Sequence, residues 1–208
     1  MQRADRSNQY VLDATPTEQE VDLVRSGLET YNREQTNGEY DRPGIEINLI
    51  LKDGEGRVVG GISASTMLRV MYLEVLWVAE ELRGRGLGRD LVLAAERIGF
   101  EQGCITSQTW TLSFQAPGFY RKIGYQVLGV YDGYRYGITE YVLKKSLQPD
   151  ALQPAGRHKK RPPGPFAITG DVTQEEMKVV HAGLREDVDQ QVGDKSKGAG
   201  IKLVIKDQ

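Results

Sequence analysis

The sequence predicts an α/β fold, and three observations support this. Segments with the two-residue period of strands alternate along the chain with segments of helical period. The chain has 208 residues, of which 39% are hydrophobic, enough for one ample domain with its own core. A proline-rich stretch then separates this domain from a shorter unit. We therefore divide the chain into a domain over residues 1–147, a basic linker over 148–165 and a partial repeat over 166–208.

The elements of the first domain follow from apolar spacing and from turn signals. Pro16, followed by Glu18 and Glu20, marks a helix start, because proline and acidic residues suit the first helical turn. Asp53-Gly54 predicts a hairpin turn between two alternating strands. The expected order is strand 10–14, a helix from Thr15, strands 45–52, 57–65 and 71–78, helix 83–102, strand 104–110, helix 115–123, and strands 124–130 and 139–144.

Composition excludes several classes of protein. The formal net charge of −2 argues against a nucleic-acid binder, and no apolar run approaches the length of a membrane span. Cys104 is the single cysteine, and with His158 and His181 it is too little for a zinc site. We therefore expect a cytoplasmic protein that binds neither nucleic acid nor membrane and holds no metal.

Residues 76–92 carry the most informative motif, in which Arg83-x-x-Gly86-x-Gly88 follows a strand and opens a long helix. Glycines let backbone N–H groups converge, and a helix N-terminus adds unpaired N–H groups and partial positive charge. The motif therefore predicts a site for a diphosphate, reinforced by Arg83, Arg85 and Arg89. The spacing does not fit the dinucleotide fingerprint, and the motif lacks the Gly-Lys-Ser/Thr end of a phosphate loop.

A second stretch, Ala116-x-x-x-Tyr120-x-x-x-Gly124-Tyr125, follows about 30 residues later. With both stretches in this order, residues 10–145 resemble the GNAT superfamily of acetyl-CoA-dependent N-acetyltransferases. The resemblance implies a mixed, mostly antiparallel sheet flanked by helices, whose central strands splay around acetyl-CoA. Where many members have asparagine, this chain has Ser113, and Gln115 could substitute for it.

The resemblance also implies roles for particular residues. The amide of Val78 would face the thioester oxygen, and Tyr120 would protonate the departing sulfur. Glu74, two residues before Leu76 on the expected central strand, is the candidate base or ammonium anchor. The implied cofactor-binding residues are Leu76, Trp77, Val78, Arg83, Gly84, Arg85, Gly86, Leu87, Gly88, Arg89, Ser113, Ala116, Phe119 and Tyr120.

The expected reaction is acetyl transfer from acetyl-CoA to a primary amine of a small molecule, by direct attack on the thioester. Two alternatives stay open: a protein or peptide acetyltransferase, and a non-catalytic acyl-CoA sensor or assembly module.

Residues 166–208 resemble the front of the first domain, as a truncated strand–helix–strand repeat. Thr173-Gln-Glu-Glu-Met matches Thr17-Glu-Gln-Glu-Val, and Ala182-Gly-Leu matches Ser26-Gly-Leu. A fragment of this length cannot bury enough apolar surface alone. It must dock on the first domain, pair across a homodimer or stay loose.

Overall fold

The computed structural model describes residues 14–148 and 165–192. Its contacts divide the chain into two units, residues 1–43 and 44–208.

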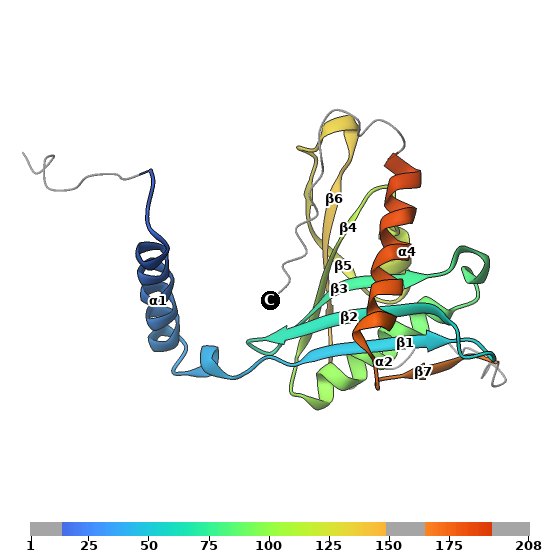
Figure 1. The fold of residues 1–208 in the computed structure, drawn as a ribbon, viewed down its shortest axis with the longest axis horizontal. Helices are drawn as coiled ribbons and strands as arrows, with labels where there is room; N and C mark the ends of the chain where they lie inside the picture. The colour runs from blue at the N-terminus through green and yellow to red at the C-terminus, as the bar shows by residue number, and fades with distance from the viewer. Residues whose placement is uncertain (1–13, 149–164, 193–208) are drawn as a thin grey trace, which may run out of the picture. The chain divides into compact units, whose positions relative to one another are not determined.

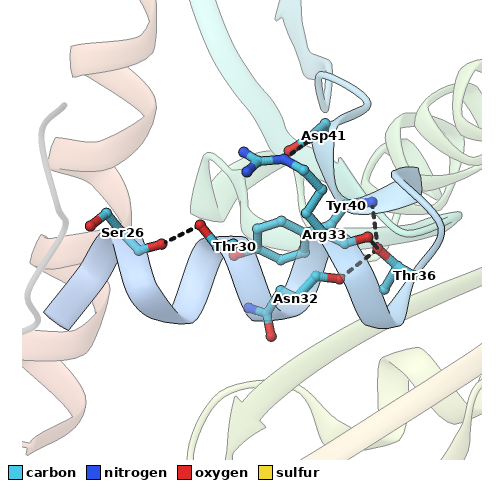
Figure 2. Close-up of polar contacts among 7 residues, drawn as sticks. All are labelled: Ser26, Thr30, Asn32, Arg33, Thr36, Tyr40 and Asp41. Atoms are coloured by element: carbon cyan, nitrogen blue, oxygen red, sulfur yellow. Dashed lines mark hydrogen bonds and ion pairs between the residues drawn. The ribbon is translucent and has the colours of Figure 1, made fainter. Parts of the chain in front are cut away.

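The first unit contains the helix α1 (Glu18–Gln35) and a short 3₁₀ turn, η1 (Glu39–Asp41). Thr17 and Glu20 form a reciprocal capping box at the start of α1, so the helix begins after Pro16 and not at Thr15 as expected, while Glu18 and Glu20 do lie in its first turn. At the other end, Arg33 Nε donates to Asp41 over 2.5 Å, and the Thr36 hydroxyl accepts from the amide of Tyr40 over 3.1 Å (Figure 2). Local polar contacts therefore fix both ends of α1. The expected strand over 10–14 falls almost wholly outside the described residues.

The second unit is built on a seven-stranded sheet in the order β5-β6-β4-β3-β2-β1-β7 (Figure 1). Its strands are β1 (Glu46–Lys52), β2 (Val58–Met67), β3 (Val70–Val78), β4 (Thr106–Leu112), β5 (Gln126–Tyr131), β6 (Glu140–Ser146) and β7 (Ala167–Thr169). Among the pairs that the structure describes, β3 with β4 is parallel and the others are antiparallel. The mixed, mostly antiparallel sheet that the sequence predicted is therefore confirmed.

Two long helices contact the same three strands, β1 to β3. On α2 (Leu87–Glu101), Gly99 lies against Met71 of β3, whereas Gly183 of α4 (Gln174–Val192) lies against Trp77 of that strand. Figure 1 shows α4 crossing in front of the strands. The remaining helices are short: α3 (Pro117–Lys122), η2 (Glu80–Leu82) and η3 (Arg135–Gly137).

The C-terminal segment packs on the sheet of its own chain. β7 extends the sheet by pairing antiparallel with β1, with Ile168 opposite Leu51, and α4 follows it. Val180 of α4 is completely buried, and Lys52 of β1 pairs with Glu176 over 2.5 Å. Of the strand–helix–strand repeat that the sequence predicts, the structure describes the strand and the helix. The third part, 201–207, lies outside the described residues.

One boundary differs from the sequence-based expectation in a way that matters for the site. The helix expected over 83–102 begins at Leu87, and residues 83–86 form a loop before it. Gly84 and Gly86 have φ angles of 74° and 82°, in the left-handed region that interrupts a right-handed helix. The glycines therefore shape the loop and do not belong to the first helical turn.

A buried ion pair lies in the core beside β4. Lys145 of β6 contacts Glu96 of α2 over 2.6 Å, and their side chains are 6% and 0% exposed. Burial raises the pKa of Glu96, while the hydrogen bond and the charge of Lys145 act in the opposite direction. The pair joins α2 to the far half of the sheet.

No helix within 14–148 or 165–192 is both long and apolar enough to cross a lipid bilayer.

Candidate active site

The two central strands separate halfway along their length. Val70–Leu73 of β3 pairs with Thr106–Thr109 of β4, and the pairing ends there. Beyond it, β3 continues against β2 to Val78, and β4 continues against β6 to Leu112. The hydroxyl of Thr109 donates to the carbonyl of Leu73 over 3.1 Å at this point. Beyond Leu73 and Thr109, β3 therefore pairs only with β2 among the described strands, and β4 pairs only with β6. The two central strands no longer bond to each other there, and a space opens between them.

A cavity of about 310 Å³ occupies this opening. It is lined by aromatic, small and acidic side chains from both strands, from α3 and its preceding loop, and from α4. The lining residues are Glu74, Leu76, Trp77, Val78, Arg83, Thr109, Trp110, Thr111, Phe114, Gln115, Ala116, Phe119, Tyr120, Leu184, Asp187, Val188 and Gln191. Many residues that the sequence singled out therefore meet in one place.

Glu74 reaches the cavity from an irregular position on β3. Simple alternation predicts that Glu74 shares a face with Leu76 and Val78, but a bulge interrupts the register there. Val75 pairs with Ser63, whereas Leu73 pairs with the next residue of β2, so Glu74 is the extra residue. Its carboxylate accepts a hydrogen bond of 2.5 Å from the hydroxyl of Ser65. The bulge, together with this hydrogen bond, fixes a carboxylate at the cavity wall.

Tyr120 places a buried phenol in the lining of the cavity. Its side chain is 7% exposed, and its ring meets those of Phe119 and Tyr125 edge to face, with centroids 5.1 and 5.5 Å away. Burial raises the pKa of Tyr120 to about 12, although a hydrogen bond with Thr109 acts in the opposite direction. At neutral pH the phenol therefore keeps its proton and can donate it to a developing anion.

The N-terminus of α2 lies beside the cavity but does not line it: a Cβ built on Gly88 would lie 3.7 Å from Phe119 and 3.8 Å from Val78, which are both lining residues. The first intrahelical bond runs from the amide of Asp90 to the carbonyl of Gly86, so the amides of Leu87, Gly88 and Arg89 precede the helical ladder. Gly86 is the N-cap, and no side chain in the described part of the chain caps it. The helix start therefore presents backbone donors and the positive end of its dipole.

The arginines of the motif are held in three different ways. Arg83 Nε donates to the carbonyl of Val78 over 2.9 Å, and its guanidinium pairs with Asp187 of α4. Arg85 donates to the carbonyl of Glu81 over 3.1 Å, within the same link. Arg89 lies 3.5 Å from the carboxylate of Asp90, its neighbour in the first turn of α2. Arg83 is therefore directed toward α4 and the cavity wall.

Ser113 and Gln115 differ in their relation to the cavity. Ser113 does not belong to its lining: its hydroxyl accepts from the amide of Thr139 over 3.2 Å. Gln115 does line the cavity, and its side-chain oxygen accepts from the amide of Leu112 and from the hydroxyl of Thr111, over 2.9 and 3.1 Å. Of the two, Gln115 is thus the one with a side chain at the opening.

The sequence did not single out the side chains that α4 contributes. The cavity is lined by Leu184, Asp187, Val188 and Gln191 of α4, a helix that begins more than sixty residues after the end of β4 at Leu112. Their spacing along α4 indicates a helix face, but nothing in it indicates which strands that face covers. Asp187 can therefore be recognised as a site residue only from the folded structure.

Comparison with known proteins agrees with this architecture. The acetyltransferase (GNAT) family matches residues 13–125. A blasticidin-S acetyltransferase of Streptomyces morookaense is 41% identical over 105 residues, which are 50% of this chain and 77% of the relative. Among solved structures, an acetyltransferase from Bacillus cereus aligns with a TM-score of 0.60 and 29% identity, covering 65% of this chain and 97% of its own.

The family model spans more than half of the chain, and the Streptomyces relative is 41% identical over most of its own length. The chain therefore belongs to the GNAT acetyltransferase family and is an acyltransferase. A second relative, an acetyltransferase of Agrobacterium fabrum, is 26% identical over 58% of this chain and 85% of its own length.

Proposed function

We propose that this protein transfers the acetyl group of acetyl-CoA to a primary amine of a small molecule. One observation carries the proposal: Tyr120, a buried phenol that stays protonated, lines the cavity where the central strands separate. The open N-terminus of α2 is separated by residues 79–86, which contain η2 and the loop 83–86, from the end of β3, the strand that forms the other wall.

The loop and the helix start fit the diphosphate of acetyl-CoA. The amides of Leu87, Gly88 and Arg89 precede the helical ladder, and Gly86 has no side chain that could fill the space above them. These amides would hold the diphosphate, as the resemblance implies. Beyond Leu73, the edge of β3 that no longer pairs with β4 would bind the pantetheine arm in the opening.

The far part of the cavity fits a cationic amine. Glu74 supplies a carboxylate, and the ring-bearing side chains of Trp77, Trp110 and Phe114 surround the remaining space. Aromatic faces and a carboxylate both favour an ammonium group. The name of the Streptomyces relative adds blasticidin S as the first acceptor to test.

In the proposed reaction a neutral amine forms a C–N bond to the acetyl carbon, and the C–S bond breaks. The Tyr120 hydroxyl gives its proton to the leaving thiolate, and the proton that the amine loses passes toward Glu74 or solvent. Such proton transfer by a positioned side chain contributes about 10²–10⁴-fold in typical enzymes. No covalent enzyme intermediate is needed.

The test is amine-dependent release of free coenzyme A thiol from acetyl-CoA. The panel contains blasticidin S, short aliphatic diamines and a lysine-containing peptide, each assayed with the wild-type chain. Glu74→Gln should raise the KM for the amine at least about tenfold, since it removes one charged partner. Glu101→Gln, at the exposed end of α2, is the matched carboxylate control and should leave the KM unchanged.

The results of the panel distinguish a small-molecule acetyltransferase from a peptide acetyltransferase and from a sensor. Release with small amines and none with the peptide supports the proposal. Release with the peptide alone would establish a peptide acetyltransferase, and acetyl-CoA binding without release for any amine would establish a sensor.

A further inference from the structure

The helix α4 packs on the sheet through two close contacts that allow little variation. Val180 is completely buried, and a Cβ built on Gly61 of β2 would lie 2.6 Å from its Cγ2. Three residues on, a Cβ built on Gly183 would lie 2.2 Å from the ring of Trp77. We call the surface formed by Gly61, Trp77 and Ile50 the α4-binding surface. It accepts a helix with a β-branched residue followed, three positions later, by glycine.

The helix α1 repeats the same pattern in the same order. Its capping box joins Thr17 and Glu20, as Thr173 and Glu176 are joined before α4, with the threonine hydroxyl 3.3 Å from the glutamate amide in each. At the offset that relates the two boxes, Val24 stands where α4 has its buried valine. The same offset matches Gly27 to the glycine against Trp77, and Leu28 to Leu184.

Within the described part of the first unit, Val24, Gly27 and Leu28 of α1 make no packing contact that would bury them. The helix has no buried residue, and the side chains of Val24 and Leu28 are 75% and 60% exposed. A Cβ built on Gly27 would meet no atom within 4 Å, although glycine weakens an exposed helix relative to alanine. The polar contacts in Figure 2 fix the end of α1 without using this apolar face. No contact in the part of the first unit that the structure describes therefore requires glycine at position 27, whereas the contact of α4 with Trp77 does require glycine at the matching position, 183.

We propose that α1 and α4 are alternative occupants of the α4-binding surface, so that α1 binds there, within the same chain, when α4 leaves. The repeated valine–glycine spacing carries the proposal, because amphipathicity alone requires an apolar stripe and no glycine. A segment of the same chain has a high effective concentration, which favours it over a second copy.

The exchange would alter the cavity. The offset places Tyr31 where α4 has Asp187, so Arg83 would lose its carboxylate partner and face a phenol instead. At the position of Leu184, α1 has Leu28, so the side chain there would not change. A chain with α1 bound would therefore present one carboxylate fewer to the acceptor. This consequence rests on the proposed function, whereas the exchange itself does not.

The experiment follows amide hydrogen exchange of peptides from α1 and α4 in the full-length chain. In the wild type, α4 should be protected and α1 should exchange rapidly. Val180→Asp places a charge against the α4-binding surface and should reverse this pattern, slowing exchange in α1 at least about tenfold. Gly27→Leu added to Val180→Asp should abolish that protection, because its side chain would collide with Trp77.

Gly27→Leu alone serves as the matched control. In an exposed helix leucine is a better helix former than glycine, so this single variant should keep wild-type stability and α4 protection. Equal exchange in α1 with and without Gly27→Leu, in the Val180→Asp background, would overturn the proposal.

A milder variant keeps the test decisive if the charged one unfolds. Val180→Ala removes packing without burying a charge, and here too the added Gly27→Leu should reduce the protection of α1 and lower the unfolding midpoint. No difference between the Val180→Ala chains with and without Gly27→Leu contradicts the exchange. Protection of α1 that rises with protein concentration would assign the contact to a second copy and overturn the proposal for a single chain.

Discussion

The two ends of β3 and β4 differ in almost every physical respect. At one end, four residues of each strand pair in parallel, and the surrounding side chains are buried, including Met71 and Leu73 at 0% and 1% exposure. At the other end the strands separate around a cavity that contains a phenol and a carboxylate. A continuous strand therefore belongs to the core over one half of its length and lines a cavity over the other half. Substitutions near the closed end should change stability, and those near the open end should change activity.

The largest expected effect lies beside the closed end. Lys145→Met leaves the buried carboxylate of Glu96 without its cation, and breaking a buried pair in this way typically costs about 3–5 kcal/mol of unfolding free energy. Urea unfolding at pH 7 measures the loss. The loss should shrink at acid pH, because a protonated Glu96 is neutral.

The double variant Lys145→Met with Glu96→Gln is the control, since it removes the charge that Lys145→Met leaves behind. It should recover part of the lost stability, and turnover per folded molecule should stay near the wild-type value. A large fall in turnover without a fall in stability would contradict the division between the two ends.

Tyr120→Phe tests the open end. Removing the acid should lower turnover about 100-fold, within the usual range for a positioned proton donor, with little change in acetyl-CoA affinity. Because the pKa of Tyr120 is raised to about 12, the phenol stays protonated at pH 9, and the loss should be similar at pH 7 and pH 9.

Tyr125→Phe is the matched control on the closed side. Its hydroxyl lies 2.6 Å from that of Ser107 in the core and does not line the cavity. Its loss should lower the unfolding midpoint and leave turnover nearly unchanged. Equal effects of the two substitutions on turnover would remove Tyr120 from the mechanism.

Charge at the start of α2 gives a smaller, purely electrostatic test. Gly86→Glu and Gly86→Gln introduce the same bulk and the same backbone strain at a left-handed position. They differ by one negative charge beside the proposed diphosphate. The glutamate variant should bind acetyl-CoA about tenfold more weakly than the glutamine variant in calorimetry at low salt. Identical affinities would place the diphosphate elsewhere.

The smallest effect concerns the attachment of α4, which borders the open end. The hydrogen bond from Lys52, together with those from Thr173, lowers the pKa of Glu176 to about 2. A carboxylate with a lowered folded-state pKa stabilises the fold above its unfolded pKa of about 4.3. This contribution is lost as the pH falls from there toward 2.

Thermal unfolding between pH 3 and pH 6 should therefore show a lower midpoint at acid pH. Glu176→Gln should flatten part of this dependence, since an amide does not titrate in this range. An unchanged slope in this variant would show that the pair contributes nothing to the acid sensitivity.

Local patterns in the sequence were enough to predict most of the elements and the start of one helix. Apolar spacing predicted the order of strands and helices in residues 45–144, and the glycines of residues 84–88 predicted a helix start, which lies at Leu87. These features are local: periodicity and left-handed glycines depend on residues near one another in the chain. The bulge at Glu74 escaped the same reasoning, because a bulge arises from pairing with another strand. The roles of these glycines and of Tyr120 toward acetyl-CoA stay predictions from the family resemblance.

Contacts between residues that are far apart in the sequence could be identified only from the tertiary structure. It brought Asp187 from α4 to Arg83, joined Glu96 to Lys145 across the core, and placed Ser113 outside the cavity lining. It also brought the apolar face of α4 against the strands β1 to β3. An apolar face states that a helix must be buried, but its partner is fixed by packing between distant segments, where Val180 meets Gly61.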